Sequence, residues 1–254
     1  MRIVSIGEVL WDVIGDKEYL GGAALNFAAH AARLGHTVFF VSAVGKDERG
    51  RRVLERMAEI GLSTRYVREV PTHPTGVVTV ELDPAGVPRF TLHHPAAYDA
   101  PELNEGDVRE LLSPQPDWIY FGTLFQMSPQ ARQLTLRLID SHCGARLLYD
   151  VNLRKDHYTA PLVRELMARA QVTKLNEDEA ATIDRCSAGA HVRWKISAAP
   201  ILGSSAGKPP ASRAAKRAAR CSCMGSMWKP AAIRCKLRTR WGQATPSPQH
   251  SSTV

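Results

Sequence analysis

The last 70 residues of the chain have no acidic side chain. Residues 185–254 contain 13 Lys/Arg and no Asp or Glu, whereas residues 1–184 contain 20 Lys/Arg and all 25 Asp/Glu. The formal net charge of +8 therefore combines an acidic part, with a net charge of −5, and a strongly basic part. A basic protein is expected to attract nucleic acid, but here that expectation applies only to the tail.

Cysteines and long apolar runs are also scarce before residue 185. Cys143 is the only cysteine there, and the four cysteines of the tail lack the regular spacing of a zinc site. No uncharged apolar run reaches the length of about 18 residues that a transmembrane helix needs. Glu8 and Asp12 interrupt the N-terminal apolar run, which argues against a signal peptide. We expect a cytoplasmic globular protein without a membrane partner.

Up to about residue 184, apolar strand-like segments alternate with segments of helical periodicity. The predicted strands are 3–7, 38–44, 118–122, 146–150 and 172–175, and the predicted helices are 24–34, 51–60, 128–141 and 162–170. Residues 8–12 read as a continuation of the first strand, and residues 45–50 as a polar loop. This alternation predicts an α/β fold built on a parallel sheet.

Residues 75–94 interrupt the alternation. Two apolar runs flank the turn sequence Asp-Pro-Ala-Gly at 83–86, which predicts a β-hairpin, and Pro88 marks an edge position. A hairpin inserted into an α/β domain suits a lid over a site. It equally suits an edge-to-edge contact in a homodimer.

A pair of glycines, Gly21 and Gly22, precedes the helix predicted at 24–34. Glycines allow a ligand to approach the backbone closely, and Asn26 in the first helical turn can both donate and accept hydrogen bonds. This combination suits a polyhydroxylated ligand. The alternative is an ordinary glycine-rich turn that caps a helix, and these residues alone favour that alternative.

The longer spacing is more specific. The pattern Gly-Gly-x-Ala-x-Asn-x-Ala from Gly21, followed by Gly35 and Gly45, resembles the first signature of the ribokinase-like (PfkB) sugar kinases. Two further motifs of that family are matched, in order, by Asp-x-Asn-x-Arg at 150–154 and Asn-x-x-Glu at 176–179. Residues 95–99 resemble the fructokinase branch. The resemblance covers residues 2 to about 182 and implies a three-layer α/β sandwich with a small inserted β-lid.

The resemblance also implies an ATP-dependent transfer of phosphate to a sugar hydroxyl, with Mg²⁺ as the metal. The residues that would bind the sugar are Asp12, Gly21, Gly22, Asn26, Tyr98 and Arg154. Asn152, Asn176 and Glu179 would bind the cofactor, and Glu179 would organise the Mg²⁺ and its waters, because this cation prefers oxygen ligands. Without the family, Asp12 reads as a strand-end cap, Arg154 as a surface ion pair, and residues 176–179 as an acidic helix start.

The second signature of the family, Asp-Thr-x-Gly-Ala-Gly-Asp, is absent from the sequence. It would supply an anion hole from backbone N–H groups and the Asp that acts as catalytic base. The possible codons of residues 238–247, regrouped by one base, permit Asp-Thr-Val-Gly-Ala-Gly-Asp-Ala-Phe. Residues 210–223 permit a family-like stretch in the same frame. We therefore interpret residues 184–254 as a frame-shifted tail that is mostly disordered, with the shift between about residues 180 and 194.

Three functions follow from these observations. The first is a sugar kinase, with fructose favoured by residues 95–99 and with 2-keto-3-deoxygluconate and ribose still open. The second is a non-catalytic remnant, residues 1–183, that binds sugar but has no catalytic residue of its own. The third is a nucleic-acid binder acting through the basic tail, which the frame-shift interpretation disfavours.

Overall fold

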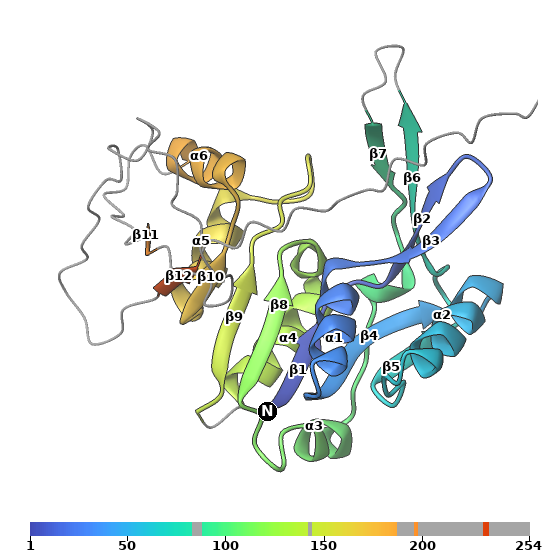
Figure 1. The fold of residues 1–254 in the computed structure, drawn as a ribbon, viewed down its shortest axis with the longest axis horizontal. Helices are drawn as coiled ribbons and strands as arrows, with labels where there is room; N and C mark the ends of the chain where they lie inside the picture. Colours follow the sequence, from blue (N-terminus) through green and yellow to red (C-terminus); the bar gives the residue numbers. More distant parts are fainter. Residues whose placement is uncertain (83–87, 142–143, 187–195, 198–230, 234–254) are drawn as a thin grey trace, which may run out of the picture.

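A parallel sheet forms the body of the protein. The computed structural model describes residues 1–82, 88–141, 144–186, 196–197 and 231–233. Eight strands of these residues run parallel in the order β11-β12-β10-β9-β8-β1-β4-β5 (Figure 1). Their bounds are β1 Arg2–Ile6, β4 Thr37–Gly45, β5 Val67–Val70, β8 Trp118–Gly122, β9 Arg146–Asp150, β10 Val172–Lys174, β11 Ile196–Ser197 and β12 Ala231–Ile233.

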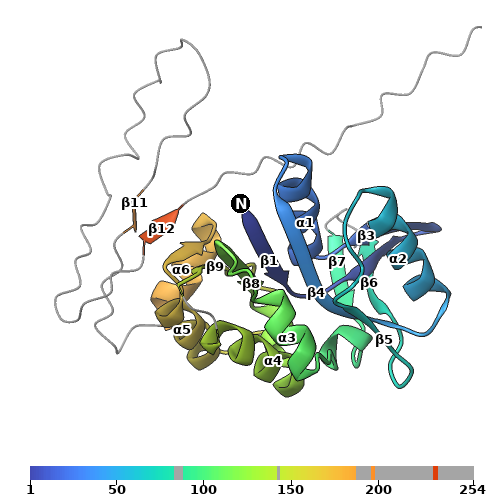
Figure 2. The same cartoon turned by 90° about the horizontal axis from the view of Figure 1, so that it is seen from below.

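Helices cover both faces of this sheet (Figure 2). On one face lie α1 (Ala23–Arg33) and α2 (Glu48–Glu59), and on the other α3 (Glu105–Leu111), α4 (Pro129–Asp140) and α5 (Ala160–Arg169). Each face has its own apolar core, because successive strand side chains point to opposite sides. The predicted three-layer α/β sandwich is confirmed.

Local signals explain where the helices begin and end. Ser128 precedes α4 and its hydroxyl accepts the Ala131 N–H at 3.4 Å, with Pro129 in the first turn. Gly35 follows α1 with φ +83°, the left-handed conformation that glycine adopts without strain. The polar loop predicted at 45–50 is wrong in its second half. The Asp47 carboxylate accepts the Gly50 N–H at 2.8 Å, and α2 therefore begins at Glu48.

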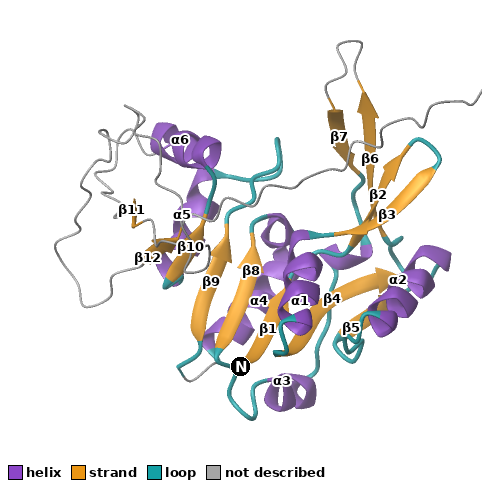
Figure 3. Ribbon diagram, viewed as in Figure 1, coloured by secondary structure: helices purple, strands orange, loops and turns teal. Residues whose placement is uncertain are grey.

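A second, four-stranded sheet stands beyond the carboxyl end of β1 (Figure 3). Its order is β3-β2-β6-β7, and we call it the lid. The strands are β2 Leu10–Ile14, β3 Lys17–Gly21, β6 Gly76–Leu82 and β7 Pro88–Leu92. The hairpin predicted at 75–94 is present as β6 and β7, with its turn at 83–87 outside the described residues, and β7 is an edge strand. The first strand, however, does not continue through residue 12, because the chain leaves the parallel sheet after Ile6 and pairs again as β2.

The basic tail is described only at two short segments. β12 pairs with β10 and β11 pairs with β12, which extends the parallel sheet at the β10 edge. The prediction of a disordered tail, and the stretches read as frame-shifted signatures, otherwise lie outside the described residues. None of the helices in the described part of the chain has the length and apolar character that a bilayer crossing requires.

Candidate functional site

The order in which strands are added to the parallel sheet reverses at β1. From β1 the chain passes through α1 to β4 on one side of the sheet, and later returns to β8 on the other side of β1. In open parallel sheets the crevice at such a point, outside the carboxyl ends of the strands, is where ligands bind. Glu8, Asp150 and Asn176 follow or end strands of the parallel sheet, so polar groups from separate parts of the chain meet at one edge.

Asp12 lies on β2 of the lid, opposite Tyr19 in register. A Cβ atom added to Gly21 would clash with the Asp12 carboxylate, so Gly21 leaves the space that this carboxylate fills. Burial raises the pKa of Asp12, and the nearby positive charge of Arg154 partly offsets that increase. The structure thus places Asp12 against Gly21 and within electrostatic reach of Arg154, and all three are predicted sugar-binding residues.

Gly22 joins the lid to α1. Its φ is +114°, and a Cβ there would clash with the carbonyl oxygen of Glu8, so both the conformation and the close approach require glycine. Asn26 lies one turn into α1, with an exposed side chain and with its backbone N–H donating to the Gly22 carbonyl at 2.9 Å. Gly22 is therefore the N-cap of the helix, and the Asn26 side chain is exposed one turn further on.

Glu8 is a site residue that the sequence reasoning missed. Its side chain is 4% exposed and accepts the Ala23 N–H at 3.1 Å, at the start of α1. Burial raises the pKa of Glu8; the charge of Arg154 acts to lower it and that of Asp150 to raise it. The only sequence signal was an acidic residue directly after a buried strand.

Asp150, at the end of β9, is buried and fully partnered. It accepts hydrogen bonds from the Tyr120 hydroxyl at 2.9 Å and from Lys174 Nζ at 2.9 and 3.1 Å. Phe27 of α1 stacks on the Tyr120 ring with 4.1 Å between centroids. These contacts fix the end of β9, from which the motif Asp150-x-Asn152-x-Arg154 continues.

Asn176 and Glu179 form a reciprocal capping box at the start of α6 (Glu177–Cys186). Glu179 N–H donates to Asn176 Oδ1, and Asn176 N–H to Glu179 Oε2, each at 2.8 Å. The second oxygen of Glu179 accepts the Leu153 N–H at 3.1 Å, and the residue is 8% exposed. Glu179 therefore holds the loop that carries Asn152, whose φ is +35°, and Arg154.

This loop and α6 line an open pocket of about 570 Å³. Its lining combines two cationic side chains with three carboxylates and several amide and hydroxyl groups: Asn152, Leu153, Arg154, Lys155, Asp156, Tyr158, Asn176, Asp178, Glu179 and Thr182. Within the described residues no group of three His, Cys, Asp or Glu side chains is arranged to hold a metal ion. The residues predicted for the cofactor, Asn152, Asn176 and Glu179, do lie together here.

Tyr98 lies away from this open surface. It is in the short 3₁₀ segment η1 (Ala97–Asp99), is 1% exposed, and belongs to the larger apolar core. Gly76 provides the room for its ring, and its hydroxyl is 3.5 Å from His94 Nε2. Burial raises the pKa of Tyr98 far above the ordinary tyrosine value. Its predicted contact with a sugar stays a prediction.

An all-parallel sheet between two helical layers, with a small sheet over its carboxyl edge, defines the ribokinase-like class of α/β proteins. Residues 2–186 match the pfkB family carbohydrate kinase. The chain belongs to this family.

Named relatives agree with this assignment. The aminoimidazole riboside kinase of Salmonella typhimurium is 29% identical over 212 residues, which are 77% of this chain and 64% of that protein. The fructokinase of Klebsiella pneumoniae is 27% identical over 194 residues, 72% of this chain and 62% of that protein. The chain thus spans less than two thirds of the length of these relatives.

Solved structures show the same fold. An uncharacterized sugar kinase from Pyrococcus horikoshii, solved in complex with ATP, has a TM-score of 0.67 at 25% identity, covering 76% of this chain and 68% of that chain. The fructokinase from Xylella fastidiosa with bound ATP has a TM-score of 0.66 at 24% identity, covering 74% of this chain and 61% of that chain.

Proposed function

We propose that residues 1–186 form the sugar-binding part of an ATP-dependent sugar kinase with a fructose-like substrate. The observation that carries the proposal is the position of the Asp12 carboxylate. It lies directly against Gly21, which has no side chain, and within electrostatic reach of Arg154. A sugar presents several hydroxyl donors, which a carboxylate accepts, while the missing side chain at Gly21 gives the ring room. Fructose is supported by residues 95–99 and by the fructokinases among the relatives.

For the cofactor, the residues that fit are those lining the pocket beside α6. Arg154 and Lys155 would meet phosphate oxygens, and Asn152 and Asn176 would donate hydrogen bonds. Both oxygens of Glu179 already accept backbone N–H groups, so this carboxylate would act on Mg²⁺ through ordered waters. ATP with its Mg²⁺ supplies the phosphoryl group, and these side chains would orient it.

We further infer that the chain as written binds a sugar but does not transfer phosphate to it. Phosphoryl transfer to a hydroxyl needs a positioned base and donors for the charge on the phosphoryl group. Residues 185–254 contain no Asp or Glu, and the family's second signature, which holds that base, is absent from them. The polar residues described above bind and orient, and none of them is assigned the role of base.

Titration calorimetry with fructose, ribose and 2-keto-3-deoxygluconate tests the binding part of the proposal. We expect fructose to bind most tightly and Asp12→Asn to weaken it at least tenfold, which is about 1.4 kcal/mol. Asp16→Asn, an exposed carboxylate in the turn of the same hairpin, is the matched control and should bind as the parent does. Equal affinity of the parent and Asp12→Asn would overturn the assignment.

A coupled ATP/fructose assay tests the inactivity. We expect no turnover above the background of a preparation made from an empty vector. Turnover within about tenfold of the rate of a full-length fructokinase (typical kinase rates are about 1–100 s⁻¹) would contradict the inference that the base is missing.

A further inference from the structure

The lid face opposite Asp12 is attached to helix α2. Directly paired residues lie on one side of a sheet, so Glu18 and Trp11 share the face that does not carry Asp12. Trp11 is 3% exposed, and its Nε1–H donates to the Arg49 carbonyl of α2 at 3.2 Å. The strand that presents Asp12 is therefore fastened to α2 by the residue directly before it.

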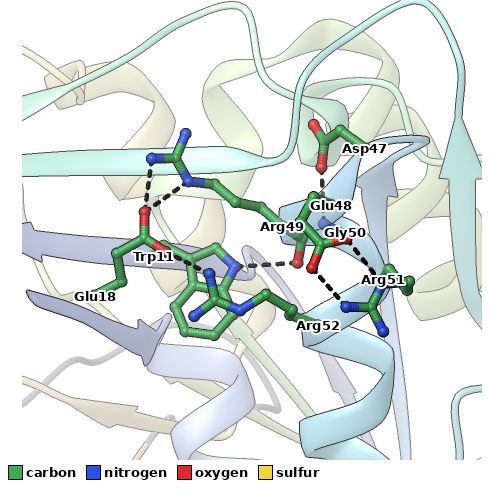
Figure 4. A network of polar contacts seen from close by, with 8 residues as sticks. All are labelled: Trp11, Glu18, Asp47, Glu48, Arg49, Gly50, Arg51 and Arg52. Atoms are coloured by element: carbon green, nitrogen blue, oxygen red, sulfur yellow. Dashed lines mark hydrogen bonds and ion pairs between the residues drawn. The ribbon is translucent and has the colours of Figure 1, made fainter.

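Glu18 makes the second attachment, on β3 (Figure 4). Its Oε1 accepts from Arg49 Nε at 3.0 Å and from Arg49 Nη2 at 2.7 Å, and its Oε2 accepts from Arg52 Nη1 at 2.6 Å. The Arg52 guanidinium also lies 4.4 Å from the centroid of the Trp11 ring. These two arginines hold the pKa of Glu18 below its ordinary value. Charge-assisted bonds that use both carboxylate oxygens fix direction as well as distance.

The same helix also holds the other half of the lid. Asp47, the N-cap of α2, accepts the Thr75 N–H at 2.8 Å and the Thr75 hydroxyl at 2.6 Å, and Thr75 directly precedes β6. A Cβ on Gly45 or Gly50 would clash with this arrangement, since Gly45 lies against Thr75 and Gly50 against the Gly45 carbonyl. Both halves of the lid thus contact the N-terminal part of α2.

We propose that the first two turns of α2 fix the orientation of the lid relative to the body. We further propose that Glu18 is a positioning residue for Asp12. Glu18 lies on the opposite face from Asp12, so it acts through the strand rather than on the sugar. Asp12 belongs to the lid, whereas Asn26 and Arg154 belong to the body, and a sugar that contacts all three needs a fixed angle between them. This role rests on the proposed sugar binding.

The proposal is tested with Glu18→Gln, which keeps the size of the side chain and removes its charge. Amide hydrogen exchange without sugar reports the attachment, and calorimetry with fructose reports the positioning. We expect exchange in residues 10–21 to rise about five- to tenfold and fructose affinity to fall by a similar factor. Exchange in β1 and β4 should not change. Trp11→Phe, which removes the indole N–H together with part of the buried ring, should raise exchange in the same residues.

Glu55→Gln is the matched control, because Glu55 is on α2 and pairs with Arg51 rather than with the lid. It should leave both exchange and affinity unchanged. Unchanged exchange in Glu18→Gln would contradict the proposal that α2 fixes the orientation of the lid. Raised exchange with unchanged fructose affinity would contradict the positioning role of Glu18. If the parent chain binds no sugar at all, the proposed function and the positioning role both fail, and the exchange data alone decide whether α2 holds the lid.

Discussion

The two sheets of this protein are stabilised in different ways. The central strands β4, β1, β8 and β9 of the parallel sheet are largely buried on both faces, and side chains such as Phe40, Ile119 and Phe121 have no exposed surface. The lid leaves large apolar side chains exposed, with Ile14 at 36%, Tyr19 at 44% and Phe90 at 59%. Apolar burial thus holds the body, while the lid combines a few buried apolar side chains, such as Trp11 and Val78, with polar contacts to α2.

This difference suggests that the body determines the stability of the protein and that the lid determines how a sugar is positioned. By register, Ile14, Tyr19 and Phe90 share the lid face that carries Asp12. These three side chains are therefore only partly covered, whereas Trp11 on the other face belongs to the core around α1 and α2. Changes in the body should alter the free energy of unfolding, and changes in the lid should alter sugar affinity.

The largest expected effect comes from the body core. Phe121 is fully buried on β8 and stacks on Tyr149, with 5.4 Å between ring centroids. Phe121→Ala should lower the free energy of unfolding by about 3–5 kcal/mol, measured by urea denaturation. The matched lid variant Phe90→Ala should change it by less than about 0.5 kcal/mol. Similar losses in both variants would show that the lid is packed as tightly as the body.

The second-largest effect on stability is expected at Glu179, whose carboxylate connects the Asn152–Arg154 loop to α6 through the Leu153 N–H. Glu179→Ala leaves the N–H groups of Asn176 and Leu153 without their acceptor, and should cost about 2–3 kcal/mol in the free energy of unfolding. Asp178→Ala, on the same helical turn but more exposed, should cost less than about 1 kcal/mol. Thermal denaturation of both variants provides the measurement. An equal cost would mean that Glu179 serves only as an acidic helix start.

The fold was predicted more accurately from the sequence in the body than in the lid. The strands at 38–44, 118–122 and 146–150 are mainly apolar, and they were placed within about a residue. The β2–β3 hairpin was missed because residues 8–12 were read as a continuation of the first strand, although Gly7 and Glu8 stand where the chain leaves the parallel sheet. Helix α3 was also missed, although Asn104 and Asp107 cap each other there and both residue types were visible in the sequence.

The site was predictable only where a residue acts through its own position in a motif. Asp12 lies against Gly21 and within electrostatic reach of Arg154, three residues that the family resemblance assigned to the sugar. Glu8 could not be predicted, because its role depends on Ala23 and on the charge of Arg154, far away in the sequence. The burial of Tyr98 likewise depends on the space left by Gly76.

Gly21→Ala would test whether the lid affects affinity without affecting stability. The added methyl meets the end of the Asp12 side chain, which can rotate away, so the free energy of unfolding should change little. The displaced carboxylate would no longer face the sugar, and fructose affinity should fall about tenfold, or 1.4 kcal/mol. In the Asp12→Asn background the same change should add almost nothing, because the two residues act together. Additive losses measured by calorimetry would mean that Gly21 contributes separately from Asp12.

The smallest expected effect is a pH dependence at the contact between the lid and the body. His94 follows β7, and its ring lies 5.1 Å from that of His157 in the loop after β9. Burial first, and then the charge of His94, lower the pKa of His157. The unfolded chain therefore takes up this proton at a higher pH than the folded one does, and stability is lost as the pH falls from about 6.5 towards the lowered value. His157→Gln should reduce the slope of unfolding free energy against pH between about 5 and 7, whereas His36→Gln, at the far end of α1, should leave it unchanged. If the slope persists in His157→Gln, the titration that weakens the lid contact belongs to another group.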